Sequence, residues 1–406
     1  NKSILFITSS IVAGVIMYNI TNKKNNYIPR NNLNNQQTYK SESFLAAAEY
    51  LNAMKANQNK GYIDINDILL VEEKINQFNK NHINKSLGIN WEEVGPVNIG
   101  GRSRAILVDR NNPAIIYAGG VAGGLWKSVN YGLQWKKIND SQDNLAVTCI
   151  AQDKDGNIYY GTGEGLAISP GHNANTGSIG GGLFKSTDGG KTFSLINSTK
   201  PTLNNESNPW AYINDIKIDL NKNRIYVAIN GGIRYSDNGG ETWVNPLSNI
   251  SLTSNMCGKN IAIASDGTVY VSLTNKNVYT SKVFRSATGN SGSFEDLSTG
   301  KSGKLPYSGI LRTECAVAPS DPNIVYASCV SGQIIGIYMS KDKGDTWEVI
   351  GPGGSDAFNP FMAQGYYNNS LFVFPDNPKR LWVGGVDIYE WQEGKTWQQI
   401  SSGGFP

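Results

Sequence analysis

The sequence predicts an all-β protein, a β-propeller of four-stranded blades, and three observations support this prediction. Glycine is abundant, at 45 of 406 residues, and aromatic residues make up 10%, which favours turns and strands over helical bundles. A chain of this length exceeds what one hydrophobic core usually serves, so we expect either several domains or one radially repeated architecture. The third observation, an internal repeat, decides in favour of the repeated architecture.

The repeat contains a short turn motif that recurs six times between residues 91 and 406. Its most complete copy, Ser-Thr-Asp-Gly-Gly-Lys-Thr-Phe, runs from Ser186 to Phe193, and the six copies begin 50 to 58 residues apart, at positions 128, 186, 236, 286, 340 and 390. In such a turn Asp or Asn accepts hydrogen bonds from backbone amides, glycine takes a positive φ, and the final aromatic residue packs into the sheet. We therefore assign the motif a structural role. The residues with this role are Ser128, Asn130, Gly132, Trp135, Ser186, Asp188, Gly190, Thr192, Phe193, Ser236, Asn238, Gly240, Thr242, Trp243, Ser340, Asp342, Gly344, Thr346 and Trp347.

Short predicted strands surround each copy of the motif. Two apolar strands separated by a turn, such as Asn112-Pro113, precede it; a third strand leads into it and a fourth follows it. Four antiparallel strands in about 50 residues, repeated six times, are typical of a propeller, and we expect seven or more blades in the full protein. The stretch from Trp91 to Pro96 matches Trp347 to Pro352, so the domain opens with a strand that elsewhere ends a blade. The natural protein is therefore expected to continue beyond Pro406, with residues 91–406 forming a propeller that is incomplete at its C-terminus.

Three different segments precede the repeats. Residues 1–20 hold an uncharged, mostly apolar run after Lys2, which predicts a signal sequence or a membrane anchor. Residues 21–42 are rich in asparagine and are interpreted as a linker. Residues 43–88 carry two apolar stripes at helical spacing and predict a short helical hairpin, which either packs on the following domain or binds a partner. The two stripes are Phe44, Ala48, Leu51 and Met54, and Ile68, Val71, Ile75 and Phe78.

Composition excludes several classes of function. The 36 basic and 33 acidic residues nearly balance and form no basic patch, so no nucleic-acid partner is expected. The spacing of the four cysteines matches no zinc or Cys-x-x-Cys motif, and only two histidines are present. A metal site, a Ser-His-Asp hydrolase and a bound cofactor are therefore not expected.

The turn motif resembles the Asp-box, or bacterial neuraminidase repeat, of sialidases, sortilin-type receptors, two-propeller xyloglucanases and a photosystem assembly factor. The stretches from Trp91 to Ile106 and from Tyr117 to Ser128 are also similar to surface-exported Asp-box proteins of Bacteroidota, which often use the type IX secretion route. The resemblance implies a propeller and an extracytoplasmic location, either secreted or at the cell surface of a bacterial envelope. It also implies that the boxes lie on the rim opposite the functional face.

Candidate functional residues therefore come from the starts of the first strands, which should face the central channel, and from long loops. Arginines and aromatic side chains there could bind charged groups or stack on sugar rings. The ligand-binding candidates are Arg102, Arg104, His172, Trp210, Arg312, Tyr366 and Tyr367. An inverting glycoside hydrolase would need two carboxylates about 6.5 to 9.5 Å apart. The carboxylates that could serve are Glu164, Asp215, Glu314 and Asp356, although ion pairing explains these residues equally well.

Cys315 and Cys329 flank the Asp321-Pro322 turn on adjacent predicted strands. A cross-strand disulfide between them is feasible and would suit an oxidising compartment, while two buried thiols are the alternative. Taken together, these patterns favour a non-catalytic propeller that binds proteins or glycans at the cell surface, or that serves as a scaffold in a surface assembly. It would contact a membrane only through residues 1–20. The alternative is a xyloglucanase-like glycoside hydrolase that uses two carboxylates.

Overall fold

The structure, a computed structural model, describes most of the repeat region and part of the segment before it. The described residues are 54, 56, 57, 59–62, 64–81, 101–138, 144–165, 178–202, 208–252, 256–275, 277–299, 302–353, 358–362 and 364–401. All of them belong to one unit, Leu51–Pro406. The predicted signal sequence or anchor, the linker and the stretch from Trp91 to Pro96 lie outside the described residues.

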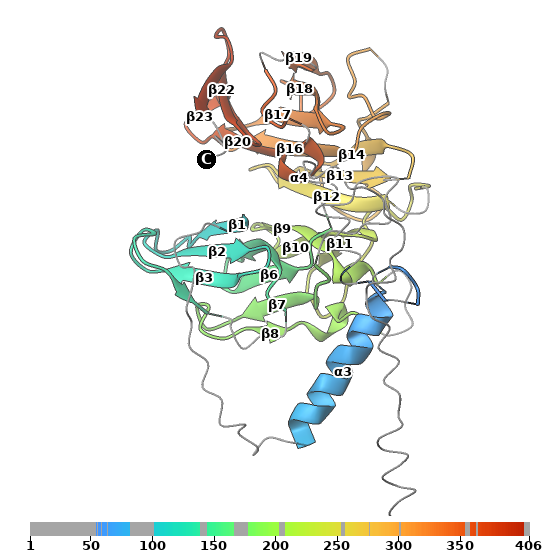
Figure 1. The fold of residues 1–406 in the computed structure, drawn as a ribbon. Coiled ribbons are helices and arrows are strands. Elements are labelled where there is room, and N and C mark those ends of the chain that lie inside the picture. The colour runs from blue at the N-terminus through green and yellow to red at the C-terminus, as the bar shows by residue number, and fades with distance from the viewer. Residues whose placement is uncertain are drawn as a thin grey trace, which may run out of the picture. The chain divides into compact units, whose positions relative to one another are not determined.

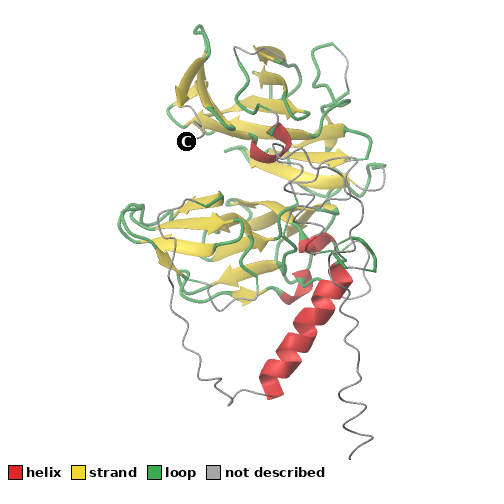
Figure 2. Cartoon of the chain, viewed as in Figure 1, coloured by secondary structure: helices red, strands yellow, loops and turns green. Residues whose placement is uncertain are grey.

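Six antiparallel sheets follow one another along the chain, which confirms the predicted all-β propeller of four-stranded blades (Figures 1 and 2). Blade 1 comprises β1 (Ser103–Val108), β2 (Ile116–Gly120), β3 (Gly124–Ser128) and β4 (Lys136–Lys137), and blade 2 comprises β5 (Val147–Gln152), β6 (Ile158–Thr162), β7 (Leu183–Ser186) and β8 (Ser194–Leu195). Blade 3 comprises β9 (Ile213–Asp219), β10 (Arg224–Ile229) and β11 (Gly232–Ser236), and a bridge between Tyr235 and Val244 takes the place of its fourth strand. Blade 4 comprises β12 (Met256–Ile263), β13 (Val269–Asn275), β14 (Thr280–Ser286) and β15 (Glu295–Asp296). Blade 5 comprises β16 (Arg312–Ala318), β17 (Asp321–Val330), β18 (Ile334–Ser340) and β19 (Glu348–Pro352), and blade 6 comprises β20 (Ser370–Phe374), β21 (Asn377–Gly384), β22 (Ile388–Gln392) and β23 (Gln398–Ser401).

Helical structure is sparse among the described residues. The long helix α3 (Ile65–Asn81) contains the second apolar stripe of the predicted hairpin, and its Val71, Ile75 and Phe78 are each more than half exposed. The first stripe lies almost entirely outside the described residues, so the hairpin itself stays a prediction. Short turns of helix lie between blades: η2 (Asn197–Thr199), η3 (Pro209–Ala211) and α4 (Gly365–Asn368). In the part of the chain that the structure describes, no helix is long and apolar enough to span a membrane.

Consecutive blades pack face to face and bury the core between them. The first strand of each blade packs against the first strand of the next, in succession from β1 to β20. Between blades 1 and 2, for example, Tyr117 lies in one buried cluster with Ile158 and Tyr160. Burial of this apolar surface stabilises the stack of sheets. Among the described residues β20 and β1 share no comparable packing, and Ile106, on the face of β1 that no described blade covers, is 70% exposed.

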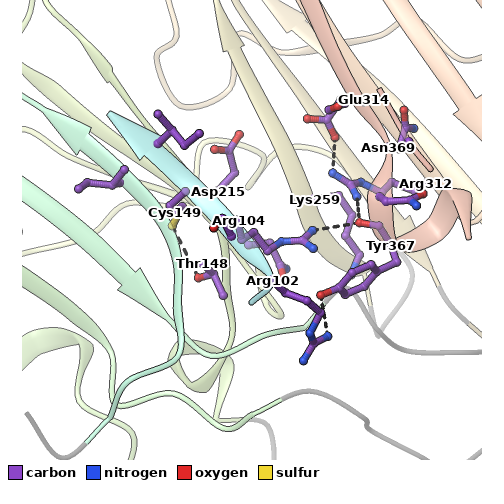
Figure 3. A pocket seen from close by; sticks show the side chains of 18 of the residues that line it. Arg102, Arg104, Thr148, Cys149, Asp215, Lys259, Arg312, Glu314, Tyr367 and Asn369 are labelled. Carbon is purple, nitrogen blue, oxygen red and sulfur yellow. Dashed lines mark hydrogen bonds and ion pairs between the residues drawn. The ribbon is translucent and has the colours of Figure 1, made fainter. Parts of the chain in front are cut away.

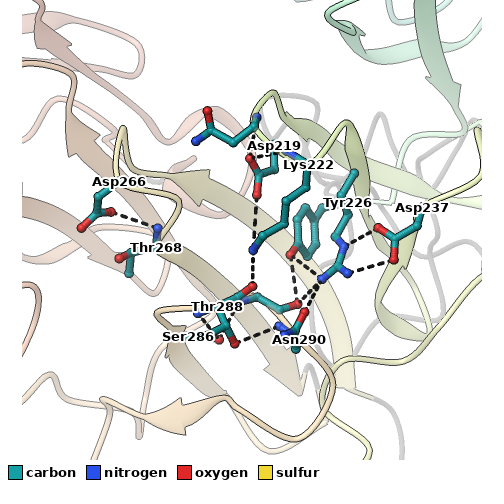
Figure 4. Close-up of polar contacts among 12 residues, drawn as sticks. Asp219, Lys222, Tyr226, Asp237, Asp266, Thr268, Ser286, Thr288 and Asn290 are labelled. Atoms are coloured by element: carbon teal, nitrogen blue, oxygen red, sulfur yellow. Dashed lines mark hydrogen bonds and ion pairs between the residues drawn. The ribbon is translucent and has the colours of Figure 1, made fainter.

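A tyrosine on the second strand ties each of several blades to a turn in a later blade. The Tyr226 hydroxyl donates a hydrogen bond to the Gly289 carbonyl at 3.0 Å, and Tyr117 bonds in the same way to Gly189 at 2.9 Å. Figure 4 shows the first of these contacts, where Arg224 also binds the Gly289 carbonyl and pairs with Asp237. The repeated aromatic residue therefore joins blades as well as filling the core.

The turn motif forms a self-contained hydrogen-bonded loop. The Ser186 hydroxyl donates to Asp188 at 2.7 Å and accepts from the Gly190 amide at 2.9 Å, and the Thr192 hydroxyl donates to Asp188 at 2.6 Å. Gly190 has a φ of +75°, which only glycine adopts easily. The same three bonds recur in the copy that starts at Ser340, with lengths of 2.7, 2.7 and 2.6 Å.

The two cysteines considered for a disulfide are free, buried thiols. Strand register pairs Cys315 with Ala327 and Cys329 with Thr313, so the cysteines are diagonal neighbours rather than directly opposite each other. The alternative of two buried thiols is the arrangement in this structure, with the two cysteines one diagonal step apart on neighbouring strands. Burial raises the pKa of the Cys329 thiol to about 12.

Candidate axial binding site

The starts of the first strands surround a cavity of about 530 Å³, which we call the axial cavity (Figure 3). All six blades contribute lining residues to it, because their first strands are the ones that pack against each other around the ring. Its lining holds five basic and two acidic side chains, so the cavity favours negatively charged groups. These side chains are Arg102, Arg104, Lys217, Lys259 and Arg312, with Asp215 and Glu314.

Local irregularities in strand pairing direct several of these side chains into the cavity. In four first strands the register skips one residue near the strand start, leaving that residue without a partner on the second strand. A bulge of this kind redirects a side chain and is common beside functional sites. The unpaired residues are Arg104, Thr148, Asn214 and Lys259, and all four line the axial cavity.

Tyr367, on the one-turn helix α4, gathers three arginines from two other blades. Its backbone carbonyl accepts hydrogen bonds from Arg104 at 3.2 Å and from Arg312 at 2.9 Å. Its hydroxyl accepts one from Arg102 at 2.7 Å, and its ring lies 4.8 Å from the guanidinium carbon of Arg104 and 5.6 Å from that of Arg102. Figure 3 shows the ring turned toward these arginines. Tyr367 therefore links the start of blade 6 to blade 1, where the first strands do not pack.

Crowding of positive charge is evident at Arg104. Burial, and next the neighbouring Arg312, lower the pKa of the Arg104 guanidinium, although Tyr367 and Glu164 oppose this shift. Both guanidinium groups converge on the single carbonyl of Tyr367. An anion bound here would relieve the repulsion between them.

Two of the predicted carboxylates in the cavity are already bonded within the protein. Asp215 accepts hydrogen bonds from the Ile216 and Ile261 amides, each at 2.9 Å, and pairs with Lys217 at 2.8 Å. Glu314 pairs with Arg312 at 2.6 Å and accepts a hydrogen bond from Asn260 at 2.9 Å. Burial raises the pKa of Glu314, and Asp215 adds to this increase although Arg312 opposes it.

Glu164, which follows β6, is the exception among the described carboxylates of the site. Its side chain is 1% exposed, is not part of the cavity lining, and lies 3.7 Å from Arg102 and 3.9 Å from Arg104. Burial, and next the contact with Glu164, raise the pKa of the Tyr367 hydroxyl, although neither carboxylate oxygen makes a hydrogen bond of normal geometry. Arg312 Nε, Asn214 Oδ1 and Asn369 Oδ1 are also buried without a partner. Buried polar groups are usually hydrogen-bonded, so this cluster of unsatisfied groups marks the arginine end of the cavity as unusual.

The structure brings together some of the predicted site residues and separates others. Of the predicted ligand-binding residues, Arg102, Arg104, Arg312 and Tyr367 line one cavity. Trp210 lies in η3 and packs on Trp243 at 4.8 Å between ring centroids, as part of a blade core. Tyr366 is not a lining residue of the cavity. His172 and Asp356 lie outside the described residues.

Several polar lining residues, among them Lys217 and Asn369, were not among the sequence-based candidates for ligand binding. Asn369 directly precedes β20, so its position at a strand start was a signal that could have identified it. Lys217 lies in the middle of β9, and nothing in its sequence context distinguishes it from a solvent-facing strand residue. Within the described ranges no group of three or more His, Cys, Asp or Glu side chains could hold a metal ion.

Comparisons with known proteins found one short match to a family model and several similar solved structures. A family model described as "Two component regulator propeller" matches residues 141–164, and no curated protein matches the chain. A solved structure of an ancestral GH74 enzyme is 18% identical, with a TM-score of 0.54, and the match covers 73% of this chain and 40% of that one. The GH74 xyloglucanase from Xanthomonas campestris is 15% identical, with a TM-score of 0.47 and coverage of 75% and 55%. A structure of YCF48 bound to D1 peptide is 15% identical, with a TM-score of 0.46 and coverage of 74% and 82%.

These likenesses concern architecture alone, because the sequence identities are low. The chain spans only 55% and 40% of the lengths of the two GH74 enzymes. The six sheets, the packing of their first strands and the match to the ancestral enzyme all lead to the same assignment. The chain has the fold of a β-propeller built from four-stranded blades.

Proposed function

We propose that this protein is a non-catalytic, extracytoplasmic binding module or scaffold that holds a negatively charged group of a protein or glycan partner in its axial cavity. The observation that carries the proposal is the charge of the lining, five basic side chains against two acidic ones. Because Asp215 and Glu314 are bonded within the protein, the basic side chains dominate what a ligand would meet. The extracytoplasmic location rests on the apolar run in residues 1–20 and on the Asp-box resemblance.

The cavity is suited to binding rather than to bond cleavage. A general base needs a carboxylate oxygen free to take a proton from water, but both oxygens of Asp215 are bonded to backbone amides and one also pairs with Lys217. Arginines, in contrast, bind carboxylates and sulfates through paired hydrogen bonds and keep their charge at any physiological pH. The site therefore supplies recognition of anions, and neither Asp215 nor Glu314 has a carboxylate oxygen free of bonds within the protein.

Binding can be tested on the purified chain with two anionic probes, a poly-glutamate peptide and polygalacturonate, by isothermal titration calorimetry. We expect at least one probe to bind, with an affinity that falls as salt increases because exposed charges are screened. Arg102→Gln should weaken binding about tenfold, since a hydrogen bond to a charged group contributes about 1.5 kcal/mol. Arg110→Gln, on the same blade but at the other end of β1, is the matched control and should bind as the unchanged protein does. Absence of binding by both probes would contradict the proposal.

A glycoside hydrolase is the second candidate, and one observation favours it. The raised pKa of Glu314 is the property that a general acid requires, and Asp215 is close enough to contribute to that shift. An assay of reducing-end release from xyloglucan and other β-glucans tests this candidate. Turnover that is abolished by both Glu314→Gln and Asp215→Asn would replace the binding proposal with the hydrolase.

A further inference from the structure

Tyr367 occupies the arginine end of the axial cavity as a ligand would. Its carbonyl takes two arginine hydrogen bonds, its hydroxyl takes a third, and its ring lies against two guanidinium groups. These are contacts that an aromatic residue of a bound peptide could make in its place. The geometry points to a more specific ligand, a peptide that ends in an aromatic residue with a free α-carboxylate. Tyr367 fills the place of that residue when no ligand is bound. This inference rests on the proposed function.

The first argument for this ligand is the number of donors around the carbonyl. A carbonyl offers one oxygen, and Arg104 and Arg312 share it. A carboxylate offers two oxygens and a full negative charge, which suits paired bonds from guanidinium groups. Arg312 Nε is buried without a partner and is a donor that the carbonyl of Tyr367 leaves unused. The carboxylate is therefore the better acceptor for this set of donors.

The second argument is the unsatisfied carboxylate of Glu164. Both of its oxygens are buried without a hydrogen bond of normal geometry, and Arg102 and Arg104 approach only to 3.7 and 3.9 Å. The Tyr367 hydroxyl is a further polar neighbour, and Glu164 contributes to the raised pKa of that hydroxyl. A buried carboxylate in this condition carries a free-energy cost that a donor can remove. The hydroxyl of a ligand tyrosine in the place of the Tyr367 ring provides such a donor, whereas a simple inorganic anion does not.

The third argument concerns the ring. Arg102 and Arg104 flank the Tyr367 ring at distances typical of cation–π contacts. A ligand ring can take this position only after the Tyr367 side chain leaves it. Tyr367 therefore competes with the ligand, and removing its side chain should strengthen binding, while removing an ordinary contact residue would weaken it.

The experiment measures the dissociation constant of a fluorescein-labelled peptide, Gly-Ser-Gly-Ser-Tyr with a free carboxylate, by fluorescence anisotropy. Tyr367→Ala should bind this peptide about tenfold more tightly than the unchanged chain, because the Tyr367 ring no longer occupies the place of the ligand ring and only the backbone carbonyl must still move aside. The same peptide with a C-terminal amide, or with Ala as its last residue, should not show this gain. Tyr367→Phe, which keeps the ring, should stay near the original affinity.

Two further variants make the outcome decisive. Tyr366→Ala changes the neighbouring residue of the same helical turn, which does not line the cavity, and should leave the affinity unchanged. Tyr367→Leu keeps an apolar side chain, which guards the test against loss of folding in Tyr367→Ala, and it should also tighten binding. Thermal unfolding of each variant verifies that it is folded.

The inference is overturned if the Tyr367 variants bind the free-acid peptide no better than the unchanged chain, or if the acid and amide peptides bind equally. If poly-glutamate or polygalacturonate still binds in an Arg102-dependent manner in that case, the proposed function holds and only the aromatic terminus is wrong. If none of the probes binds the unchanged chain or its variants, the proposed function fails as well.

Discussion

The two ends of the blades in this propeller differ in how fully their polar groups are hydrogen-bonded. At one end the turn motif satisfies its own polar groups: Ser186, Asp188 and Thr192 bond to one another and to the backbone of their turn. At the other end, around the axial cavity, Glu164 and Arg312 Nε are buried without hydrogen bonds of normal geometry. The strand register shows that these features lie at opposite ends of a blade. Ser103, at the start of β1, pairs with Gly120. Val108, at the end of β1, pairs with Ile116, which in turn pairs with Ser128, the first residue of a turn motif.

The difference separates the residues that build the fold from those that line the candidate site. The self-satisfied turn is repeated in blade after blade with nearly the same residues. The cavity is lined by a different residue from each of the four bulged strands, an arginine, a threonine, an asparagine and a lysine. In this protein the residues that repeat from blade to blade therefore form the turns, and the residues that differ from blade to blade line the candidate site.

The largest predicted effect tests the buried end. Replacing Arg312 with Met should lower the free energy of unfolding by about 3 kcal/mol, because Glu314 would remain as a buried charge without its partner. Urea denaturation measures this loss. Glu314→Gln in the same chain should recover part of it, since the unpaired charge is then removed. Arg380→Met, which breaks the more exposed pair with Glu390, is the control and should cost clearly less; equal losses would show that the buried pair is not special.

The second prediction tests the turn end. Ser186→Ala should reduce the free energy of unfolding by about 1.5 kcal/mol, because the buried Gly190 amide loses its acceptor and Asp188 loses a donor. Ser194→Ala, at an exposed position on β8 of the same blade, should change stability by less than about 0.5 kcal/mol. The comparison is made by urea denaturation. A similar effect of both substitutions would remove the evidence that the motif is a structural device.

The smallest predicted effect contrasts the pH dependence of the two ends. Hydrogen bonds from Thr192 lower the pKa of Asp188 below its usual 3.8, so its stabilising contribution is present above that value and is lost as pH falls through the lowered pKa. Burial raises the pKa of Glu314 above its usual 4.5, so its contribution is present below 4.5 and is lost as pH rises through the raised pKa.

Urea denaturation across this pH range tests the contrast with two variants. Asp188→Asn should reduce the loss of stability in acid while leaving neutral stability nearly intact, since Asn stands at this position in the copies at 130 and 238. Glu314→Gln should reduce the loss that accompanies rising pH. Slopes of the same sign for both variants would contradict the assignment of opposite pKa shifts.

The sequence was a good guide where the chain repeats and a weaker one where it does not. The spacing of the motif located all six blades, and the strand starts correctly suggested that Arg102, Arg104 and Arg312 share a cavity. Trp210 belongs to a blade core instead, because aromatic residues near a strand start fill either a groove or a core and their type does not distinguish the two. For Cys315 and Cys329 the sequence left a disulfide and two buried thiols open, because the exact strand register depends on an irregularity in the hairpin that no local pattern reveals.

By itself the sequence determined the fold class, the number of repeats within this chain and the turn that ends each third strand. These follow from local chemistry, since strand alternation and turn residues act over a few positions. Only the tertiary structure decided that Tyr367 meets Arg102 and Arg104, which are more than 260 residues earlier in the chain, and that Glu164 is buried beside them without a hydrogen bond of normal geometry. Such contacts depend on how bulged strands from different blades converge, and no local pattern encodes that convergence.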